Sequence, residues 1–120
     1  MKKQSVLRDK SFEFGSQIID LCKVLKESKT EYVLYNQLLR SGTAIGALIR
    51  EAEFAQSRAD FINKLSIALK EANESEYWLD LLTKHQHIKR IIHGTSIQLL
   101  TEIIKMLVAS INTAKKPKEF

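Results

Sequence analysis

The stretch RADFINKLSIALKEANESEYWLDLLTKHQ, residues 58–86, carries the clearest structural signal in the chain. Its apolar and small side chains recur at alternating intervals of four and three residues, which is the spacing of one face of an α-helix that packs in a bundle. The series consists of Phe61, Leu65, Ala68, Ala72, Ser75, Leu79 and Leu82. The stretch is therefore predicted to form one long helix that turns this face toward a hydrophobic core.

The rest of the chain contains few residues that would interrupt a helix. Of its 120 residues one is a proline, Pro117, and four are glycines, and these two residue types disfavour a helix most strongly. Ser28, Ser57 and Thr95 are each followed three residues later by an acidic residue or a glutamine, a spacing typical of helix starts. We therefore predict an all-α, up-down antiparallel four-helix bundle with helices at about residues 9–27, 29–56, 58–86 and 96–114.

The length of the chain suits a single domain with one core. We expect residues 1–120 to form one bundle with short basic tails at about residues 1–8 and 115–120. No apolar run exceeds four residues, whereas a membrane-spanning helix needs about 20. The first ten residues have the charges of a signal peptide without an apolar stretch behind them, and the single cysteine, Cys22, forms no internal disulfide. We therefore expect a cytoplasmic protein that does not enter a membrane.

Two of the predicted helices have apolar surfaces too broad for one core. In residues 96–114 the apolar positions cover roughly 200° of the helix circumference. They are Ile97, Leu99, Leu100, Ile103, Ile104, Met106, Leu107, Val108 and Ile111. Residues 9–27 have a similarly broad surface, and a monomer would expose such patches to water, which soluble monomers rarely do. We therefore expect a homo-oligomer, with Trp78 at a contact between helices or subunits.

The chain is basic, with 19 Lys and Arg residues against 14 Asp and Glu residues and a formal net charge of +5. Such an excess favours acidic partners such as nucleic acid. The predicted nucleic-acid contacts are Lys2, Lys3, Arg8, Lys10, Lys84, Lys89, Arg90, Lys115 and Lys116. In an antiparallel bundle the clusters at the two chain ends share one end of the bundle, while Lys84, Lys89 and Arg90 lie at the other. The alternative interpretation is that these residues are solvated chain ends and a solvated loop.

The segment 71–80 has the opposite charge. It contains four acidic residues, Glu71, Glu74, Glu76 and Asp80. Two adjacent aromatic residues, Tyr77 and Trp78, stand among them, and aromatic side chains can stack on bases. Because of the surrounding acidic residues, the segment is expected to be a poor surface for RNA.

No constellation of residues predicts a catalytic, metal or cofactor site. Di-metal bundles use a carboxylate three residues before a histidine, but a leucine, a lysine and an arginine stand three residues before His85, His87 and His93. Cys22 falls on an apolar helix face, where cysteine is usually an inert core residue. The segment GTAIG at 42–46 lacks the ending and the preceding strand of a nucleotide-binding loop. We expect no enzyme activity and no cofactor.

Several blocks of the chain, in order, resemble the bacterial four-helix-bundle family, also called the 23S rRNA intervening-sequence protein family. They are KSFEF at 10–14, YVL at 32–34, QLLRSGT at 37–43, IGA at 45–47, REA at 50–52, ADFINKLSIALKEA at 59–72 and EYWL at 76–79. The resemblance covers roughly residues 9–110. It implies an up-down bundle that assembles into a ring, commonly a homopentamer. Related accessory proteins of diversity-generating retroelements form basic pentameric barrels that bind nucleic acid and a reverse transcriptase.

The resemblance also concerns individual polar positions. Gln37, Arg40 and Glu51 match the family pattern and are expected to form a polar network between helices or subunits. Ala44 and Leu48 depart from it, since the family usually has Ser and Asn there. Our leading hypothesis is a cytoplasmic, homo-oligomeric helical scaffold that binds RNA or DNA through phosphate contacts. The alternative is a protein-interaction module with no nucleic-acid role.

Overall fold

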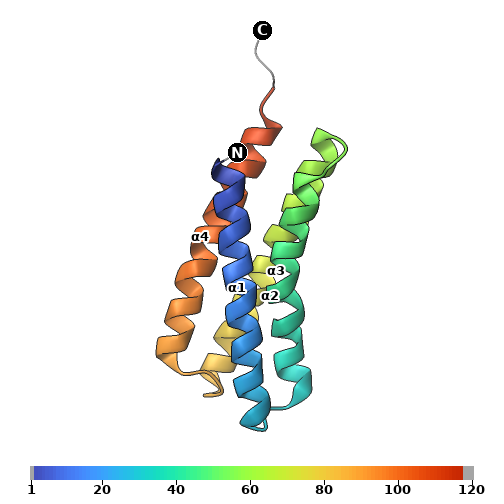
Figure 1. Cartoon of the computed structure of the whole chain (residues 1–120). Coiled ribbons are helices and arrows are strands. Elements are labelled where there is room, and N and C mark those ends of the chain that lie inside the picture. The colour runs from blue at the N-terminus through green and yellow to red at the C-terminus, as the bar shows by residue number, and fades with distance from the viewer. Residues whose placement is uncertain (1, 118–120) are drawn as a thin grey trace.

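The computed structural model describes the backbone of residues 2–117 and the side chains of residues 5–117. This part of the chain forms four helices: α1 (Lys2–Glu27), α2 (Tyr32–Glu53), α3 (Arg58–Lys84) and α4 (Arg90–Lys115). Successive helices run in opposite directions, so that the described fold is an up-down antiparallel bundle (Figure 1). The predicted fold class is confirmed.

The four helices stand at the corners of an elongated rod of 58 × 23 × 20 Å. Each helix lies against two neighbours, in the cyclic order α1, α2, α3, α4, and within the described residues the backbones of the diagonal pairs stay further apart. The α1–α4 contact is the least extensive of the four. The chain enters and leaves the bundle at one end, and the α1–α2 and α3–α4 connections lie together at the other (Figure 1). We call these the terminal end and the connection end.

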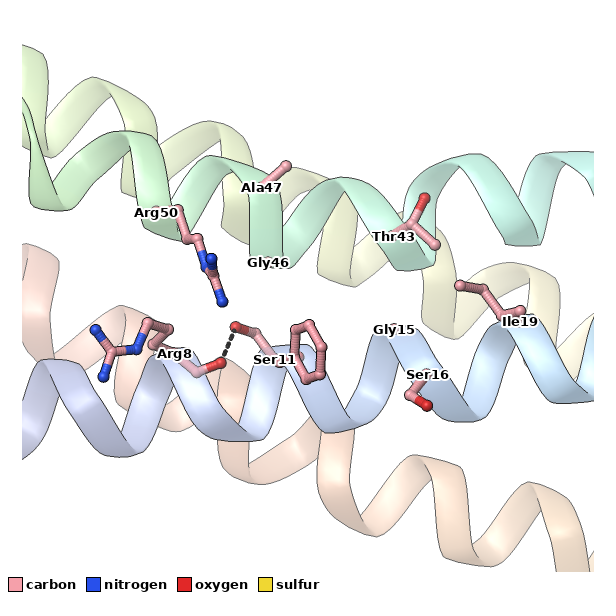
Figure 2. A pocket seen from close by; sticks show the side chains of 10 residues that line it. Arg8, Ser11, Gly15, Ser16, Ile19, Thr43, Gly46, Ala47 and Arg50 are labelled. Carbon is pink, nitrogen blue, oxygen red and sulfur yellow. Dashed lines mark hydrogen bonds between the residues drawn. The ribbon is translucent and has the colours of Figure 1, made fainter.

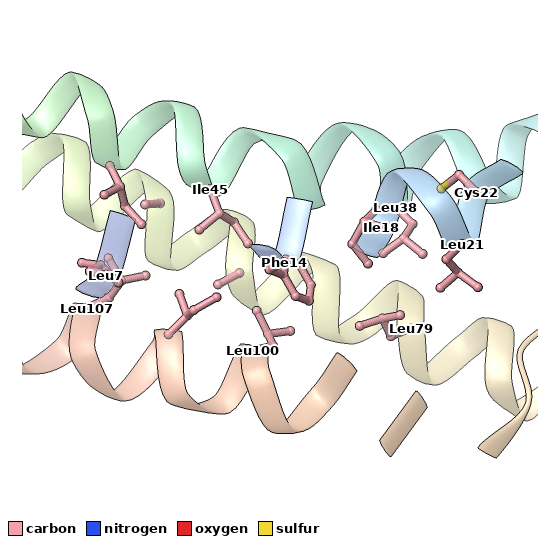
Figure 3. Packing of buried hydrophobic residues seen from close by; sticks show 14 of the residues in the cluster. Leu7, Phe14, Ile18, Leu21, Cys22, Leu38, Ile45, Leu79, Leu100 and Leu107 are labelled. Atoms are coloured by element: carbon pink, nitrogen blue, oxygen red, sulfur yellow. The ribbon is translucent and has the colours of Figure 1, made fainter. Parts of the chain in front are cut away.

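One apolar seam from each helix fills the interior (Figure 3). The seam predicted for α3 is confirmed, since it is buried at Leu65, Ala68, Ala72, Ser75, Leu79 and Leu82. Phe14 of α1 has no exposed surface and is the largest fully buried side chain among the described residues. The α4 seam consists of Ser96, Leu100, Ile103, Leu107 and Ile111. Because every seam meets at the rod axis, the bundle has a single core along its length.

Small residues allow α2 to approach both of its neighbours. Ser41 of α2 and Ser75 of α3 are fully buried, and their hydroxyl groups share a 2.9 Å hydrogen bond. On the α1 side, a Cβ atom added at Gly42 would lie 3.0 Å from side-chain atoms of Ile18, which is tighter than ordinary contact. A larger residue at Ser41 or Ser75 would push α2 and α3 apart, and a larger residue at Gly42 would push α2 away from α1.

Two helices begin earlier than the sequence predicts. The structure has α1 from Lys2, not from residue 9, so the expected basic tail over residues 1–8 is wrong for the part described. Leu7 is only 2% exposed and ties these turns to the core. The structure has α4 from Arg90, not from residue 96. The Thr95 hydroxyl does not cap this helix but donates to the carbonyl of Ile91 within it.

The other boundaries agree with the prediction to within three residues, and one predicted cap is confirmed. The Ser57 side chain accepts a 3.0 Å hydrogen bond from the Asp60 amide at the start of α3. Ser28 does not begin α2, because Lys29 next to it adopts a φ of 62° and the helix starts at Tyr32. A left-handed residue breaks the helical path, so the chain turns before it can resume. The ends of α2 at Glu53 and of α3 at Lys84 also precede the predicted residues 56 and 86.

Among the described residues, α4 is the one helix long and apolar enough to cross a membrane. Core helices of soluble bundles meet the same criterion, and the α4 seam packs inside the protomer. Ile91, Ile92 and Val108 of this helix are nevertheless exposed. The helix therefore offers apolar surface that the single chain leaves uncovered.

We expect the substitution Phe14→Ala to lower the free energy of unfolding by about 3–5 kcal/mol, because it leaves a cavity at the centre of the core. Urea denaturation followed by circular dichroism measures this loss. The control is Phe54→Ala, at a side chain that is 83% exposed, and it should change stability by less than about 0.5 kcal/mol. Equal effects of the two variants would contradict the assigned core.

Candidate nucleic-acid interface

The connection between α3 and α4 gathers basic side chains at the connection end. Lys84, Lys89 and Arg90 are exposed and line an open hollow of about 810 Å³ together with Asp80 and His93. We call residues 84–90 and His93 the α3–α4 corner. The sequence predicts that these residues lie at the end of the bundle away from the chain termini, and this position is confirmed (Figure 1).

The corner is held in a defined conformation. Ile88 is only 3% exposed and anchors the connection in the core. The His87 amide donates a 2.9 Å hydrogen bond to the carbonyl of Leu82, and Gln86 adopts a φ of 66° that reverses the chain. The basic side chains therefore project from a fixed backbone, which limits the entropy lost when they bind a ligand.

The cations of the corner are available to an external anion. Lys84, Lys89 and Arg90 form no ion pair within the part of the chain that the structure describes. The acidic residue of the hollow, Asp80, already has a partner, since its Oδ1 lies 2.7 Å from Nε2 of His93. Lysine and arginine groups in this state can neutralise phosphates and release counterions.

At the terminal end, two of the predicted contacts have acidic partners within the bundle. Arg8 lies 3.6 Å from Glu53 of α2, and Lys10 lies 2.6 Å from Glu102 of α4, both measured between charged atoms. Lys115 and Lys116 are exposed at the end of α4. The side chains of Lys2 and Lys3 lie outside the described residues. Of the predicted cluster at this end, Lys115 and Lys116 are thus the described members without an internal partner.

Two further lysines share the connection end and were missed from the sequence. Lys26 lies in the last turn of α1, and Lys29 lies in the α1–α2 connection. Glu27 and Glu31 accompany them, so this side of the end has a mixed charge. An antiparallel bundle brings the connection after α1 to the same end as the α3–α4 connection. Both lysines could therefore have been predicted at this end from the sequence.

The predicted polar network is real for two of its three members. Arg40 of α2 approaches Gln37 at 3.5 Å and forms ion pairs with Glu71, at 3.2 Å, and with Glu74 of α3. Glu51 is not part of it and instead lies 3.4 Å from Lys64. The prediction for Glu51 is wrong because its position, eleven residues and about 16 Å along the helix from Arg40, faces a different part of α3. Both sets of contacts join α2 to α3 within one protomer.

Two apolar hollows flank α1. The α1–α2 groove has a volume of about 350 Å³ and small residues along its floor, Gly15 and Gly46 among them (Figure 2). At its edge the Arg50 guanidinium lies 5.8 Å from the ring centre of Phe12. The α1–α4 groove has a volume of about 380 Å³ and includes Val24 and Ile91. These grooves expose apolar side chains that one protomer does not cover.

The side-chain chemistry offers no prepared nucleophile or metal cluster in the described residues. No group of three His, Cys, Asp or Glu residues is placed to hold a metal ion there. Cys22 is buried, and burial raises the pKa of its thiol to about 11. Its Sγ lies 3.6 Å from the carbonyl oxygen of Tyr35. A thiol in this state is protonated at neutral pH and is a poor nucleophile.

The chain matches the family described as 23S rRNA-intervening sequence protein over residues 3–109. It belongs to this family. The chain is similar to a protein with unknown function from the S23 ribosomal protein family of Bacteroides thetaiotaomicron, whose crystal structure is known. The two sequences are 55% identical. The match covers 92% of this chain and 98% of that chain with a TM-score of 0.89. No curated protein matches the chain.

The two departures from the family pattern lie on α2. Leu48 is partly buried and packs against the core, so that an apolar side chain stands where the family usually has Asn. It adds apolar contact between helices, and neither it nor Ala44 can donate a side-chain hydrogen bond. Leu38 and Ile45 of the family blocks beside them are fully buried in the core.

We expect Cys22 to react with a disulfide reagent at pH 8 only as fast as the protein opens, because the native thiol is buried and protonated. Absorbance of the released thiolate, with and without urea, measures the two rates. The neutral thiol stabilises the fold below its unfolded pKa of about 8.5, and this contribution is lost as the pH rises toward 11. Rapid labelling of the native protein would contradict the burial.

Proposed function

We propose that this chain is a cytoplasmic, non-enzymatic, homo-oligomeric scaffold that binds RNA or DNA through phosphate contacts with little sequence preference. The observation that carries the proposal is the α3–α4 corner. Three exposed cationic groups stand on a fixed connection there, without ion-pair partners in the described residues. Contacts of this kind position a protein on a nucleic acid backbone without reading bases.

The exposed apolar side chains support self-association. Phe12 and Ile19 belong to the α1–α2 groove, and Val24, Ile91 and Ile92 belong to the α1–α4 groove. Both grooves lie beside α1, on adjoining faces of the rod. A contact that joins one of these faces to the adjoining face of the next copy is heterologous, and it closes into a ring when the rotation between neighbours divides a full turn, which for five copies is about 72°. We propose a pentamer, the assembly that the family resemblance implies.

The ring would increase the effect of a modest charge. Each chain carries a formal net charge of +5, and in a ring each corner repeats once per subunit. Because α3 is diagonal to α1 in the bundle, an interface along α1 leaves α3 and its corner on the outside. One nucleic acid can then contact several corners at once, and multivalent contact raises the overall affinity.

The same grooves favour a second candidate function. An apolar groove with an arginine at its edge also fits a helix of another protein, in which case the chain is a protein-interaction module. The two candidates differ in one measurement. Salt-dependent binding of mixed-sequence nucleic acid supports the first, whereas its absence even at about 50 mM salt, together with a stable complex with a protein partner, supports the second.

We expect the purified protein to be larger than a dimer in light scattering on a sizing column. The substitution Phe12→Glu should reduce the mass toward that of one chain, 13.8 kDa, because it puts a charge into a dry contact. Helical content should stay unchanged, since Phe12 is 67% exposed in the protomer. Phe54→Glu at the terminal end is the matched control and should leave the mass unaltered. A wild-type mass of one chain at micromolar concentration would rule out the scaffold.

We expect affinity for nucleic acid to fall by about 10³-fold or more between 50 and 200 mM salt if six or more phosphates are engaged. Replacing Lys84, Lys89 and Arg90 together by Ala should lower the slope of log affinity against log salt by about 2–3 units. Fluorescence anisotropy with labelled RNA and DNA measures it. Lys105→Ala, which removes one exposed charge from the middle of α4, should leave the slope unchanged. An unchanged slope in the triple variant would remove the corner from the interface.

A further inference from the structure

The outer face of α3 carries a tyrosine between two lysines. Lys70, Tyr77 and Lys84 are seven residues apart and all exposed, so they lie on one face at intervals of about 10 Å. Lys84 is also the first residue of the α3–α4 corner, and the three form a stripe that leads into it. We propose that this stripe makes the chain a single-strand binder, with Tyr77 as the platform on which a base stacks. The inference rests on the proposed nucleic-acid function and names its substrate class.

The acidic residues beside the stripe have partners or are half-buried. Glu71 and Glu74 pair with Arg40 on the side of α3 that faces α2. Asp80 is exposed, and its Oδ1 contacts Nε2 of His93 on the side that faces α4. Glu76, one turn before Asp80, shares that second side and is half-buried. Lys70, Tyr77 and Lys84 are therefore exposed between carboxylates that are already engaged.

Tyr77 is both exposed and supported. Its side chain is 58% exposed. The neighbouring Trp78 is half-buried, packs against the core and meets the Tyr77 ring edge-on, with ring centres 5.1 Å apart. An edge-to-face contact of this kind is favourable and restricts the tyrosine ring. A supported aromatic ring loses little conformational freedom when it stacks on a base.

Stacking on Tyr77 distinguishes single strands from duplexes. Bases in a duplex are already stacked on each other, and their faces are closed to a side chain on the surface of a helix. An unpaired base can turn its face to an aromatic ring, which is how single-strand binding proteins use tyrosine. The lysines contact phosphates in either form. The discrimination therefore depends on Tyr77 and not on the charge.

The stripe stays accessible in the proposed ring. The α1–α2 and α1–α4 grooves adjoin α1, whereas α3 is diagonal to α1 in the described bundle. A ring that closes through these grooves keeps the stripe on its outer surface. The stripes of successive subunits then run side by side around the ring, each ending at a basic corner.

The test compares an unstructured single-stranded RNA with a duplex of equal length by fluorescence anisotropy. We expect tighter binding of the single strand by the wild type. Tyr77→Ala should weaken single-strand binding by about 5- to 100-fold and leave duplex binding unchanged, whereas Tyr77→Phe should retain it. Phe54→Ala, at an exposed aromatic residue of the terminal end, is the matched control. Circular dichroism and light scattering verify that each variant keeps its fold and mass.

A strand with abasic sites provides a second, independent measurement. It keeps the phosphates and lacks the bases, so the wild type should bind it as weakly as Tyr77→Ala binds the intact strand, and the two changes together should have no further effect. Equal affinity for single strand and duplex, or a loss in Tyr77→Ala that is the same for both, would overturn the stripe and leave phosphate binding by the corner intact. Absence of all binding at 50 mM salt would overturn both proposals.

Discussion

A rod of four helices about 20 Å across can bury only one face of each helix. This constraint explains the regular series of small and apolar residues along α3, where Ala72 and Ser75 meet the other helices at the axis. It also means that any helix with a wider apolar surface must leave part of it outside. The exposed Phe12 and Ile91 are the result. Self-association is proposed because it would cover these side chains.

Ion pairs then determine which charges the rod presents. Exposed pairs of this kind contribute little to stability, about 0–1 kcal/mol each. Their effect on the surface charge is larger, because Glu71 and Glu74 are paired with Arg40, and Lys10 is paired with Glu102. Among the described residues, cations without ion-pair partners then remain at both ends of the rod, with Lys84, Lys89 and Arg90 at the connection end and Lys115 and Lys116 at the terminal end. The proposed interface uses the group that stands on the α3–α4 corner.

The sequence predicts the features that depend on local spacing and misses those that depend on tertiary contact. The α3 seam and the Ser57 cap are local and are confirmed. The starts of α1 and α4 are wrong because Leu7 and Ile88 are secured by a core that no local pattern reveals. Side-chain partners are hard to predict for the same reason. Glu51 pairs with Lys64, and this pairing is set by the register between α2 and α3.

The two proposed surfaces are centred on diagonal helices, and they come closest in the first turn of α4, where Arg90 of the α3–α4 corner stands next to Ile91 of the α1–α4 groove. Association along α1 and nucleic-acid contact along α3 share no side chain, so neither has to be released for the other to form. A single corner with three cations binds a phosphate backbone weakly, since non-specific contacts of this kind are salt-sensitive and individually small. Repetition around a ring supplies what one corner lacks, because a strand held at one subunit meets the next at high local concentration. In this proposal the apolar grooves beside α1 increase the affinity for nucleic acid without touching the ligand.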